Sequence, residues 1–321
     1  MLSRKIMERN RAMKQFYHGR KVLVTGGCGF IGSHLAEHLV ALGSEVTVLD
    51  DLSGGFIENI EKIKDKITFI QDTVTCKKAC LDASRNKDII FHLAAFISVP
   101  ESVEKPEMCH KINVDGTVNL LEAARVNDVE RFVLSSSGSV YGPYEIECHE
   151  ELQCYPQSPY AFSKYIGELY CRQYAINYGL KTISLRYFNV YGPRQNPKSA
   201  YAAAYATFVQ QMQQNKPIIV YGDGKQTRDF VSVFRVVEAN LILAMQDANK
   251  LKGQVFNIAT GKSITILKLI DQIREKHPEY NQDINFAPAR AGDLKHSCAA
   301  CSKYLKIYNE CYKELHNRSI V

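Results

Sequence analysis

Residues 21–39 read KVLVTGGCGFIGSHLAEHL, and this stretch decides the fold of the first part of the chain. The β-rich run Lys21–Thr25 leads directly into glycines at positions 26, 29 and 32, and an amphipathic helical pattern follows. In such a strand–turn–helix unit, Gly26 permits a tight turn, Gly29 lets backbone amides approach a pyrophosphate, and Gly32 lets the helix pack on the strand. The stretch therefore predicts a dinucleotide-binding site.

The residues around this turn indicate which dinucleotide binds. Phe30 and Ile31 open the helix, whose N-terminus would face the phosphates. Asp50 ends the second strand, eighteen residues after Gly32. Its carboxylate can accept hydrogen bonds from both ribose hydroxyls of an adenosine and would repel a 2′-phosphate. The cofactor predicted is therefore NAD, in preference to NADP.

Two later strand ends supply further candidate residues. Asp72 follows the third strand and is a candidate for the adenine edge, although a solvated carboxylate at a strand end is the alternative interpretation. Ala94 and Ala95 end the fourth strand with small side chains, where a cofactor would need access to the backbone. Packing alone also explains two alanines at this place.

Short apolar runs alternate with helical patterns through the first two-thirds of the chain. The runs are rich in β-formers and mostly lack polar alternation, as in strands that are covered on both faces. Strands alternating with helices form βαβ units, so we expect an α/β fold with a doubly wound parallel Rossmann sheet and a smaller substrate-binding lobe. The predicted strands are 21–25, 45–50, 67–70, 88–93, 131–135 and 182–187.

The pattern changes after Tyr191, which predicts the division into domains. A loop-like stretch and a helix come first, and two β-rich segments then return to the main sheet. The remainder, from Ile264 onward, is expected to be helical and irregular. The predicted parts are a basic leader helix at 1–19, an NAD-binding domain at 20–190 with returning segments at about 229–261, and a substrate-binding lobe at 191–228 and 262–321.

Composition excludes several classes of protein. No apolar run approaches the roughly 18 residues of a membrane span, so no membrane association is expected. The formal net charge is +6. All of it comes from the first 21 residues, so nucleic acid is not an expected partner. The leader lacks the apolar core and cleavage site of a secretory signal. Glu8 is the one acidic residue among the first 21 positions. The basic residues there are Arg4, Lys5, Arg9, Arg11, Lys14, Arg20 and Lys21.

The ten cysteines are unevenly spaced. A chain of 321 residues can bury enough surface without disulfides, so free thiols in a reducing cytoplasm are expected. His296, Cys298 and Cys301 have ligand-like spacing. Zinc usually takes four ligands, and no second CxxC pair completes the set, so we predict no metal site.

The reacting groups are indicated by a second motif. Ser158 and a following proline start a long helical pattern in which Tyr160 and Lys164 share one face. A tyrosine has a pKa of about 10 in water and is a poor base at neutral pH. A nearby ammonium, the positive end of the helix and an oxidised nicotinamide would all favour the phenolate, which makes Tyr160 a usable acid or base. The run SSSGSVYG at 135–142 ends the fifth strand, where it would meet this helix.

With these motifs the chain resembles the extended short-chain dehydrogenase/reductases, and within them the NAD-dependent nucleotide-sugar epimerases. The resemblance covers nearly everything from Lys21 to about Lys306. Its motifs occur in the order typical of the family. They are TGGCGFIGSH, FHLAA, SVPESVEKPEMCHKINVDGT, SSSGSVYG, SPYAFSKY, LRYFNVYGPRQNP, GDGKQTRDF and ARAGDLKHS.

The resemblance implies roles for the catalytic residues. The third serine of SSSGSVYG, Ser137, would hydrogen-bond the sugar O4 beside Tyr160, and Lys164 completes the set. Tyr160, Lys164 and Tyr187 would also contact the cofactor. Related dehydratases carry an acidic pair after this serine, whereas this chain has Gly138 and Ser139. Without an acid/base pair to eliminate water, the chemistry should stop at reversible hydride transfer through a transient 4-keto sugar.

The resemblance also implies the sugar nucleotide. Epimerases restricted to UDP-glucose and UDP-galactose carry a bulky tyrosine at the position of Ser297, so a serine there leaves room for an N-acetyl group. We therefore expect NAD-dependent 4-epimerisation of UDP-N-acetylglucosamine and UDP-N-acetylgalactosamine, or of their uronic acids. The substrate-binding residues predicted are Ser98, Ser137, Ser139, Asn189, Arg228, Arg290, Asp293 and Ser297.

Two alternatives remain at this stage, a reductase or other oxidoreductase on a nucleotide-linked 4-keto sugar, and a non-catalytic NAD-binding homologue. By the habit of the family, the protein should be a cytoplasmic homodimer that pairs through the helices around Val114 and Tyr165. One departure from the family is Phe234-Arg235, which replaces an acidic pair.

Overall fold

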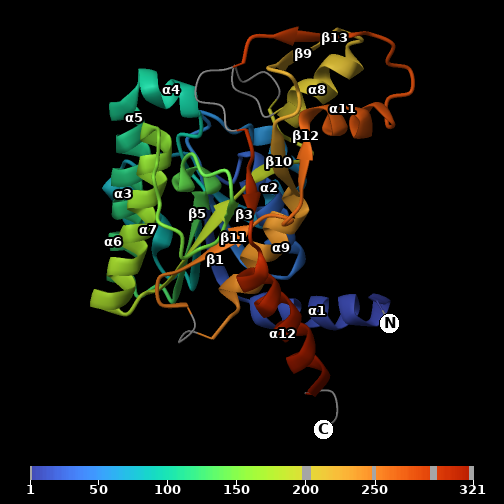
Figure 1. Ribbon diagram of the computed structural model, residues 1–321. Coiled ribbons are helices and arrows are strands. Elements are labelled where there is room, and N and C mark those ends of the chain that lie inside the picture. The colour runs from blue at the N-terminus through green and yellow to red at the C-terminus, as the bar shows by residue number, and fades with distance from the viewer. Residues whose placement is uncertain (1, 197–203, 248–250, 290–294, 318–321) are drawn as a thin grey trace.

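The computed structural model describes residues 2–196, 204–247, 251–289 and 295–317, of which 2–9 and 311–317 are described by their backbone alone. A central sheet lies between two layers of helices, and a smaller group of strands and helices lies above it in Figure 1. None of the helices within these ranges is long and apolar enough to cross a membrane.

The central sheet has seven parallel strands in the order β11-β7-β5-β4-β1-β2-β3. The predicted doubly wound α/β fold is therefore confirmed. The strand order reverses between β1 and β4, and ligands of open α/β sheets bind at the carboxyl ends of strands beside such a reversal. The strands are β1 (Lys21–Thr25), β2 (Glu45–Leu49), β3 (Ile67–Ile70), β4 (Ile89–His92), β5 (Arg131–Ser137), β7 (Lys181–Tyr187) and β11 (Gln254–Ile258).

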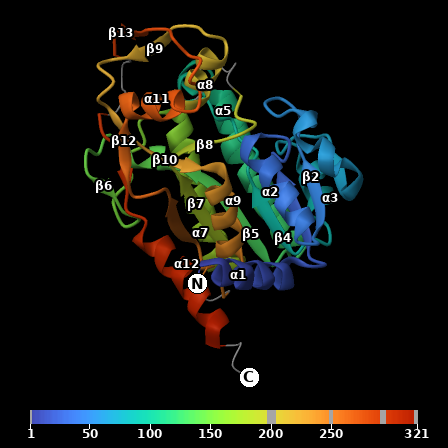
Figure 2. The same cartoon turned by 90° about the vertical axis from the view of Figure 1, so that its right-hand side faces the viewer.

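Helices cover both faces of the sheet (Figures 1 and 2). Two apolar clusters, one on each face, hold the layers together, because the buried strands contribute side chains to both sides. One face carries α2 (Phe30–Ala41), the 3₁₀ segment η1 (Ile57–Lys66) and α9 (Val233–Ala244). The other carries α3 (Lys77–Ser84), α6 (Gly116–Val126) and α7 (Pro159–Tyr178).

The smaller group of elements has an apolar core of its own, which includes Phe208, Ile270 and Tyr280. Its helices are α8 (Ala204–Gln213) and α11 (Ile266–Arg274). Its strands are β8 (Asn189–Tyr191) with β10 (Thr227–Ser232) and β12 (Ser263–Thr265), and β9 (Ile218–Tyr221) with β13 (Ile284–Ala287). A separate pair, β6 (Glu147–Cys148) with β14 (Cys298–Ala299), packs with Val140 and Tyr141.

Helix α1 (Leu2–Tyr17) is anchored to the sheet domain. Tyr17 is fully buried, and its hydroxyl donates to the backbone oxygen of Leu241 over 2.8 Å. The guanidinium groups of Arg20 and Arg131 lie 4.3 and 5.3 Å from the centre of the Phe16 ring. The predicted leader segment thus contributes side chains to the main core.

Helix α12 (Ser302–Asn317) lies in the stretch after Ile264 that the sequence predicts to be helical and irregular. Tyr304 is fully buried, and Leu305, Ile307 and Tyr308 pack against the core of the main sheet. Residues 302–310 therefore pack on the sheet domain, although the sequence assigned them to the substrate-binding lobe.

Candidate active site

The glycine-rich turn between β1 and α2 leaves no room for side chains. Gly26 has a φ of +70°, and a Cβ placed on it would lie 2.6 Å from the backbone nitrogen of Ala94. A Cβ on Gly32 would lie 2.1 Å from the backbone oxygen of Gly26. Gly29, in extended conformation, immediately precedes the first residue of α2. Backbone amides and a helix N-terminus therefore meet in one place, which fits the pyrophosphate of NAD.

The carboxylate of Asp50 holds this turn in place. Its two oxygens accept hydrogen bonds from the backbone amides of Cys28 and Leu52, over 2.8 and 2.9 Å. Burial raises the pKa of Asp50 above its ordinary value, whereas these two bonds lower it. Each oxygen keeps a further lone pair for a ribose hydroxyl. Phe30 and Ile31 open α2 on the other side of the turn.

The remaining predicted cofactor residues lie at neighbouring strand ends. Asp72 follows β3, and its carboxylate accepts the backbone N–H of the next residue. Ala94 and Ala95 follow β4. Tyr187 ends β7, but its side chain is buried and its hydroxyl donates to Asn240 of α9 over 2.9 Å. Tyr187 can therefore offer a cofactor its backbone and ring more readily than its hydroxyl.

Ser137, Ser139 and Tyr160 form a chain of hydroxyl groups at the end of β5. The hydroxyl of Ser139 donates to the Ser137 hydroxyl over 2.9 Å, and the backbone N–H of Ser139 donates to the same oxygen over 3.2 Å. The side chain of Ser137 also lies close enough to that of Tyr160 to lower the pKa of its hydroxyl. The structure thus brings together the two segments that the sequence predicts to meet.

Lys164 lies one helical turn after Tyr160 and is buried. Its Nζ donates to the backbone oxygen of Ser135 over 2.9 Å and lies 5.9 Å from the centre of the Tyr160 ring. Burial lowers the pKa of Lys164 to about 8. Burial also raises the pKa of Tyr160, and the hydrogen bond with Ser137 opposes this effect.

Asn113 was not singled out from the sequence, although it supports the catalytic helix. It lies in a π-helical turn, η2 (Lys111–Asp115), between α5 (Pro106–His110) and α6. Its Nδ2 donates to Ser163 Oγ of α7 over 2.9 Å and to the backbone oxygen of Phe96 over 3.0 Å. The only sequence signal was its place inside the quoted KINVDGT stretch.

A buried ion pair behind the serine run was also missed. Glu168 pairs with Arg186 through both of its oxygens, at 2.9 and 2.6 Å, and accepts the Ser136 hydroxyl over 2.5 Å. The guanidinium of Arg186 also lies 4.6 Å from the centre of the Tyr141 ring. These contacts connect α7, β5 and β7 next to Ser137, and no local sequence pattern predicts them.

The predicted substrate residues are distributed around this end of the sheet. Ser98 caps α4 (Val99–Glu104) and accepts the backbone N–H of Glu101. Asn189 opens β8, and its Nδ2 donates to the backbone oxygen of Asp229 over 3.0 Å. Arg228 lies in β10 next to Asp229, and both β10 and β8 belong to the same small sheet.

Ser297 is held by two strands of that sheet. Its backbone N–H donates to the oxygen of Thr227 over 3.1 Å, and its backbone oxygen accepts the Ser263 hydroxyl over 2.8 Å. The following residues form β14, and Ala299 packs with Val140 and Tyr141 of the serine run. Arg290 and Asp293 lie outside the described residues.

Comparison with known proteins supports this reading of the site. Residues 22–259 match the NAD dependent epimerase/dehydratase family. The UDP-glucose 4-epimerase of Mycolicibacterium smegmatis is 40% identical over 282 residues, which are 86% of this chain and 88% of the relative.

Two solved structures are similar over almost their whole length. The UDP-N-acetylglucosamine 4-epimerase of Methanobrevibacter ruminantium, in complex with UDP-N-acetylmuramic acid, is 36% identical with a TM-score of 0.86, over 93% of this chain and 96% of the other. The UDP-glucose 4-epimerase of Thermus thermophilus, in complex with NAD, is 35% identical with a TM-score of 0.81, over 91% and 93%.

These matches confirm the predicted resemblance, the prediction of an enzyme and the prediction of NAD as its cofactor. They agree with a glycine turn shaped for a pyrophosphate and with a serine that lowers the pKa of a tyrosine hydroxyl. The chain belongs to the NAD-dependent epimerase/dehydratase family.

Proposed function

We propose that the protein is a UDP-sugar 4-epimerase that interconverts UDP-N-acetylglucosamine and UDP-N-acetylgalactosamine, or their uronic acids. The observation that carries the proposal is the hydroxyl chain of Ser139, Ser137 and Tyr160 beside the buried Lys164. This arrangement serves a sugar hydroxyl that must lose a proton and regain it.

The residues of the chain have distinct roles in the reaction. Tyr160 accepts the proton of the sugar O4 and later returns it, while Ser137 hydrogen-bonds the same oxygen. Lys164 holds the strand end at Ser135 and places a positive charge near the tyrosine. NAD, when bound, supplies the acceptor and donor for the hydride at C4. Turning the 4-keto sugar within the site before the hydride returns inverts C4.

Gly138 and Ser139 support epimerisation over elimination of water. Neither residue can remove a proton from C5 or protonate a leaving hydroxyl. Gly138 also cannot be exchanged simply for an acidic residue, because a Cβ there would lie 2.9 Å from the ring of Phe188. The 4-keto sugar is therefore mainly reduced again by the returning hydride.

The N-acetylated substrate is supported by Ser297. Hydrogen bonds to Thr227 and Ser263 fix its backbone. A neighbouring side chain therefore cannot easily move into the space that the short serine side chain leaves open. The similar M. ruminantium enzyme is a UDP-N-acetylglucosamine 4-epimerase, whereas the M. smegmatis and T. thermophilus enzymes are UDP-glucose 4-epimerases. A site with space beside the sugar C2 admits both classes of sugar, and of the two we propose the acetylated one as the substrate.

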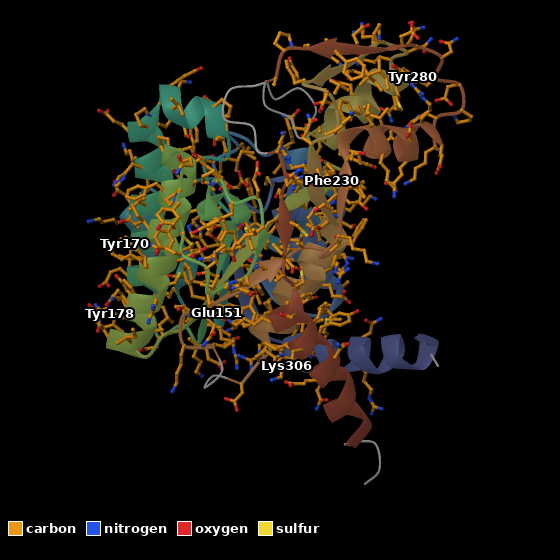
Figure 3. The ribbon with its side chains drawn as sticks, in the orientation of Figure 1. Glu151, Tyr170, Tyr178, Phe230, Tyr280 and Lys306 are labelled. Atoms are coloured by element: carbon orange, nitrogen blue, oxygen red, sulfur yellow. The ribbon has the colours of Figure 1, made fainter. Side chains whose placement is uncertain are left out.

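A homodimer formed through α7 is part of the proposal. Phe162, Leu169 and Ile176 are seven residues apart and therefore share one face of the helix, with exposed fractions of 56%, 44% and 64%. Figure 3 shows Tyr170 and Tyr178 on the same outer flank of the molecule. Exposed apolar side chains gathered in this way are typical of an interface.

The cysteines whose side chains are described are free thiols, which supports a cytoplasmic location.

The first test is to incubate the purified protein with UDP-N-acetylglucosamine, without added NAD, and to follow the products by NMR. We expect UDP-N-acetylgalactosamine from the wild type. Tyr160→Phe should reduce the rate by about 10²–10⁴-fold because it removes the acid/base group. Tyr170→Phe, which removes an exposed hydroxyl from the same helix, should retain wild-type activity.

A second variant tests the sugar specificity. Ser297→Tyr should lose activity on UDP-N-acetylglucosamine while keeping activity on UDP-glucose. If the wild type converts UDP-glucose but not the acetylated sugar, even with added NAD, the substrate assignment is wrong. Net consumption of NADH with a 4-keto sugar, and no epimerised product, would instead favour a reductase.

A further inference from the structure

The hydroxyl of Ser137 has an unusual set of hydrogen bonds. A serine hydroxyl can accept two hydrogen bonds and donate one. Both acceptor positions of Ser137 are filled by Ser139, one by its O–H and the other by its N–H. The remaining group of Ser137 is its own proton, and the neighbouring polar atom is the hydroxyl of Tyr160.

We propose that Ser139 is a positioning residue, which forces Ser137 to act only as a hydrogen-bond donor, toward Tyr160 in the free enzyme and toward the substrate O4 once the sugar is bound. This inference rests on the proposed epimerase function and deepens it. Ser139 was expected from the sequence to contact the sugar directly, and the inference instead has it act through Ser137.

The local backbone keeps Ser139 in this position. Residues 138–141 form a 3₁₀ turn, η3 (Gly138–Tyr141), with Ser137 as its N-terminal cap. Val140 and Tyr141 are almost fully buried, and the Tyr141 hydroxyl donates to Asn257 of β11 over 2.7 Å. Gly138 packs closely against Phe188. A turn anchored on both sides cannot easily swing Ser139 away from Ser137.

The other groups around Tyr160 do not replace Ser137. Lys164, on the same helix, donates to the backbone oxygen of Ser135 and helps to lower the pKa of His92 of β4. From α5, Cys109 lies near Tyr160 and raises its pKa. From α4, the hydroxyl of Ser102 accepts the backbone N–H of Tyr160. Among the described residues, Ser137 is therefore the one whose side-chain hydroxyl lowers the pKa of Tyr160.

The consequence concerns the protonation of Tyr160. A dedicated donor stabilises the phenolate and gives no acceptor to the neutral phenol. In Ser139→Ala one lone pair of Ser137 becomes free, so Ser137 can rotate and accept the phenol proton. The neutral form then gains a hydrogen bond and the pKa of Tyr160 rises. Ser137 keeps its own proton throughout the reaction.

The test compares Ser139→Ala with Ser139→Thr, which retains a hydroxyl and should restore wild-type behaviour. In Ser139→Ala, the acid limb of the profile of kcat/KM against pH should lie at a pH about one unit higher. The reason is that Ser137 can then hydrogen-bond the neutral phenol as well as the phenolate. At pH 7 the loss should be about tenfold, and the two profiles should converge at high pH. A loss of equal size at every pH, or superimposed profiles, would overturn the proposal.

A second measurement needs no substrate. The protein is labelled with ¹³Cζ-tyrosine, and the Tyr160 resonance is assigned by its loss in Tyr160→Phe. Its pH titration should move upward in Ser139→Ala and return in Ser139→Thr. An unchanged titration of Tyr160 in Ser139→Ala would contradict the inference even if the enzyme is active. If the wild type is inactive on UDP-N-acetylglucosamine while the titration moves as expected, the substrate assignment fails and the inference stands.

Discussion

At the scale of single residues, Lys164 combines function with a cost in stability. Its ammonium is buried in the fold, which lowers its pKa to about 8. Between pH 8 and its unfolded value of about 10.5, the unfolded chain holds this proton and the folded chain does not. Stability contributed by this site therefore rises with pH in that window and is constant below it.

Lys164→Met measures this contribution. From pH 8 to about 10.5 the wild type should gain roughly 3 kcal/mol of unfolding free energy relative to the variant. Urea denaturation at several pH values measures the difference. Lys62→Met, at an exposed position, should follow the wild type across the same range. A difference between wild type and Lys164→Met that is independent of pH contradicts the prediction.

Single residues also mark the limit of what the sequence predicted. The strand-end placement of Asp50 followed from spacing, but its bonds to the amides of Cys28 and Leu52 depend on the folded turn. The shared helix face of Tyr160 and Lys164 was predicted, but the bond from the ammonium to the backbone oxygen of Ser135 was not. A shared helix face establishes proximity, whereas the hydrogen-bond partner depends on a strand distant in sequence.

At the scale of elements, the contact between β1 and α2 depends on the glycines. Gly32→Ala should force the backbone apart, because its Cβ would lie 2.1 Å from Gly26 O. We expect a loss of about 1–3 kcal/mol of stability and of the NAD carried through purification. Denaturation curves and the NAD released on heating measure both effects. Gly54→Ala, where nothing lies within 4 Å, is the matched control and should change neither.

The elements themselves were predicted unevenly. Continuous β-rich runs located all six early strands of the sheet, since strands covered on both faces are apolar throughout. The π-turn at Lys111–Asp115 was not predicted, because it interrupts a helical pattern without any break in the sequence. The packing of helix α12 on the main core was not predicted, because the contacts of Tyr304 and Tyr308 are made with elements distant in sequence.

At the scale of the whole molecule, the exposed stripe of α7 predicts the assembly. Leu169→Glu and Ile176→Glu should convert a dimer into a monomer, because they place charges in an apolar contact. Light scattering after gel filtration measures the mass. Phe286→Glu, an equally exposed apolar position on β13, should leave the dimer intact. A wild type that is already monomeric at micromolar concentration contradicts the prediction.

The bond between Tyr17 and Leu241 also bears on how the protein is made. The two residues are separated by 224 positions, so the first helix is synthesised long before its binding place exists. During translation α1 has to wait until α9 has left the ribosome, while the neighbouring strands β1 to β5 can already assemble. Helix α12, which packs on the same core, is made later still, so this face of the domain is completed last.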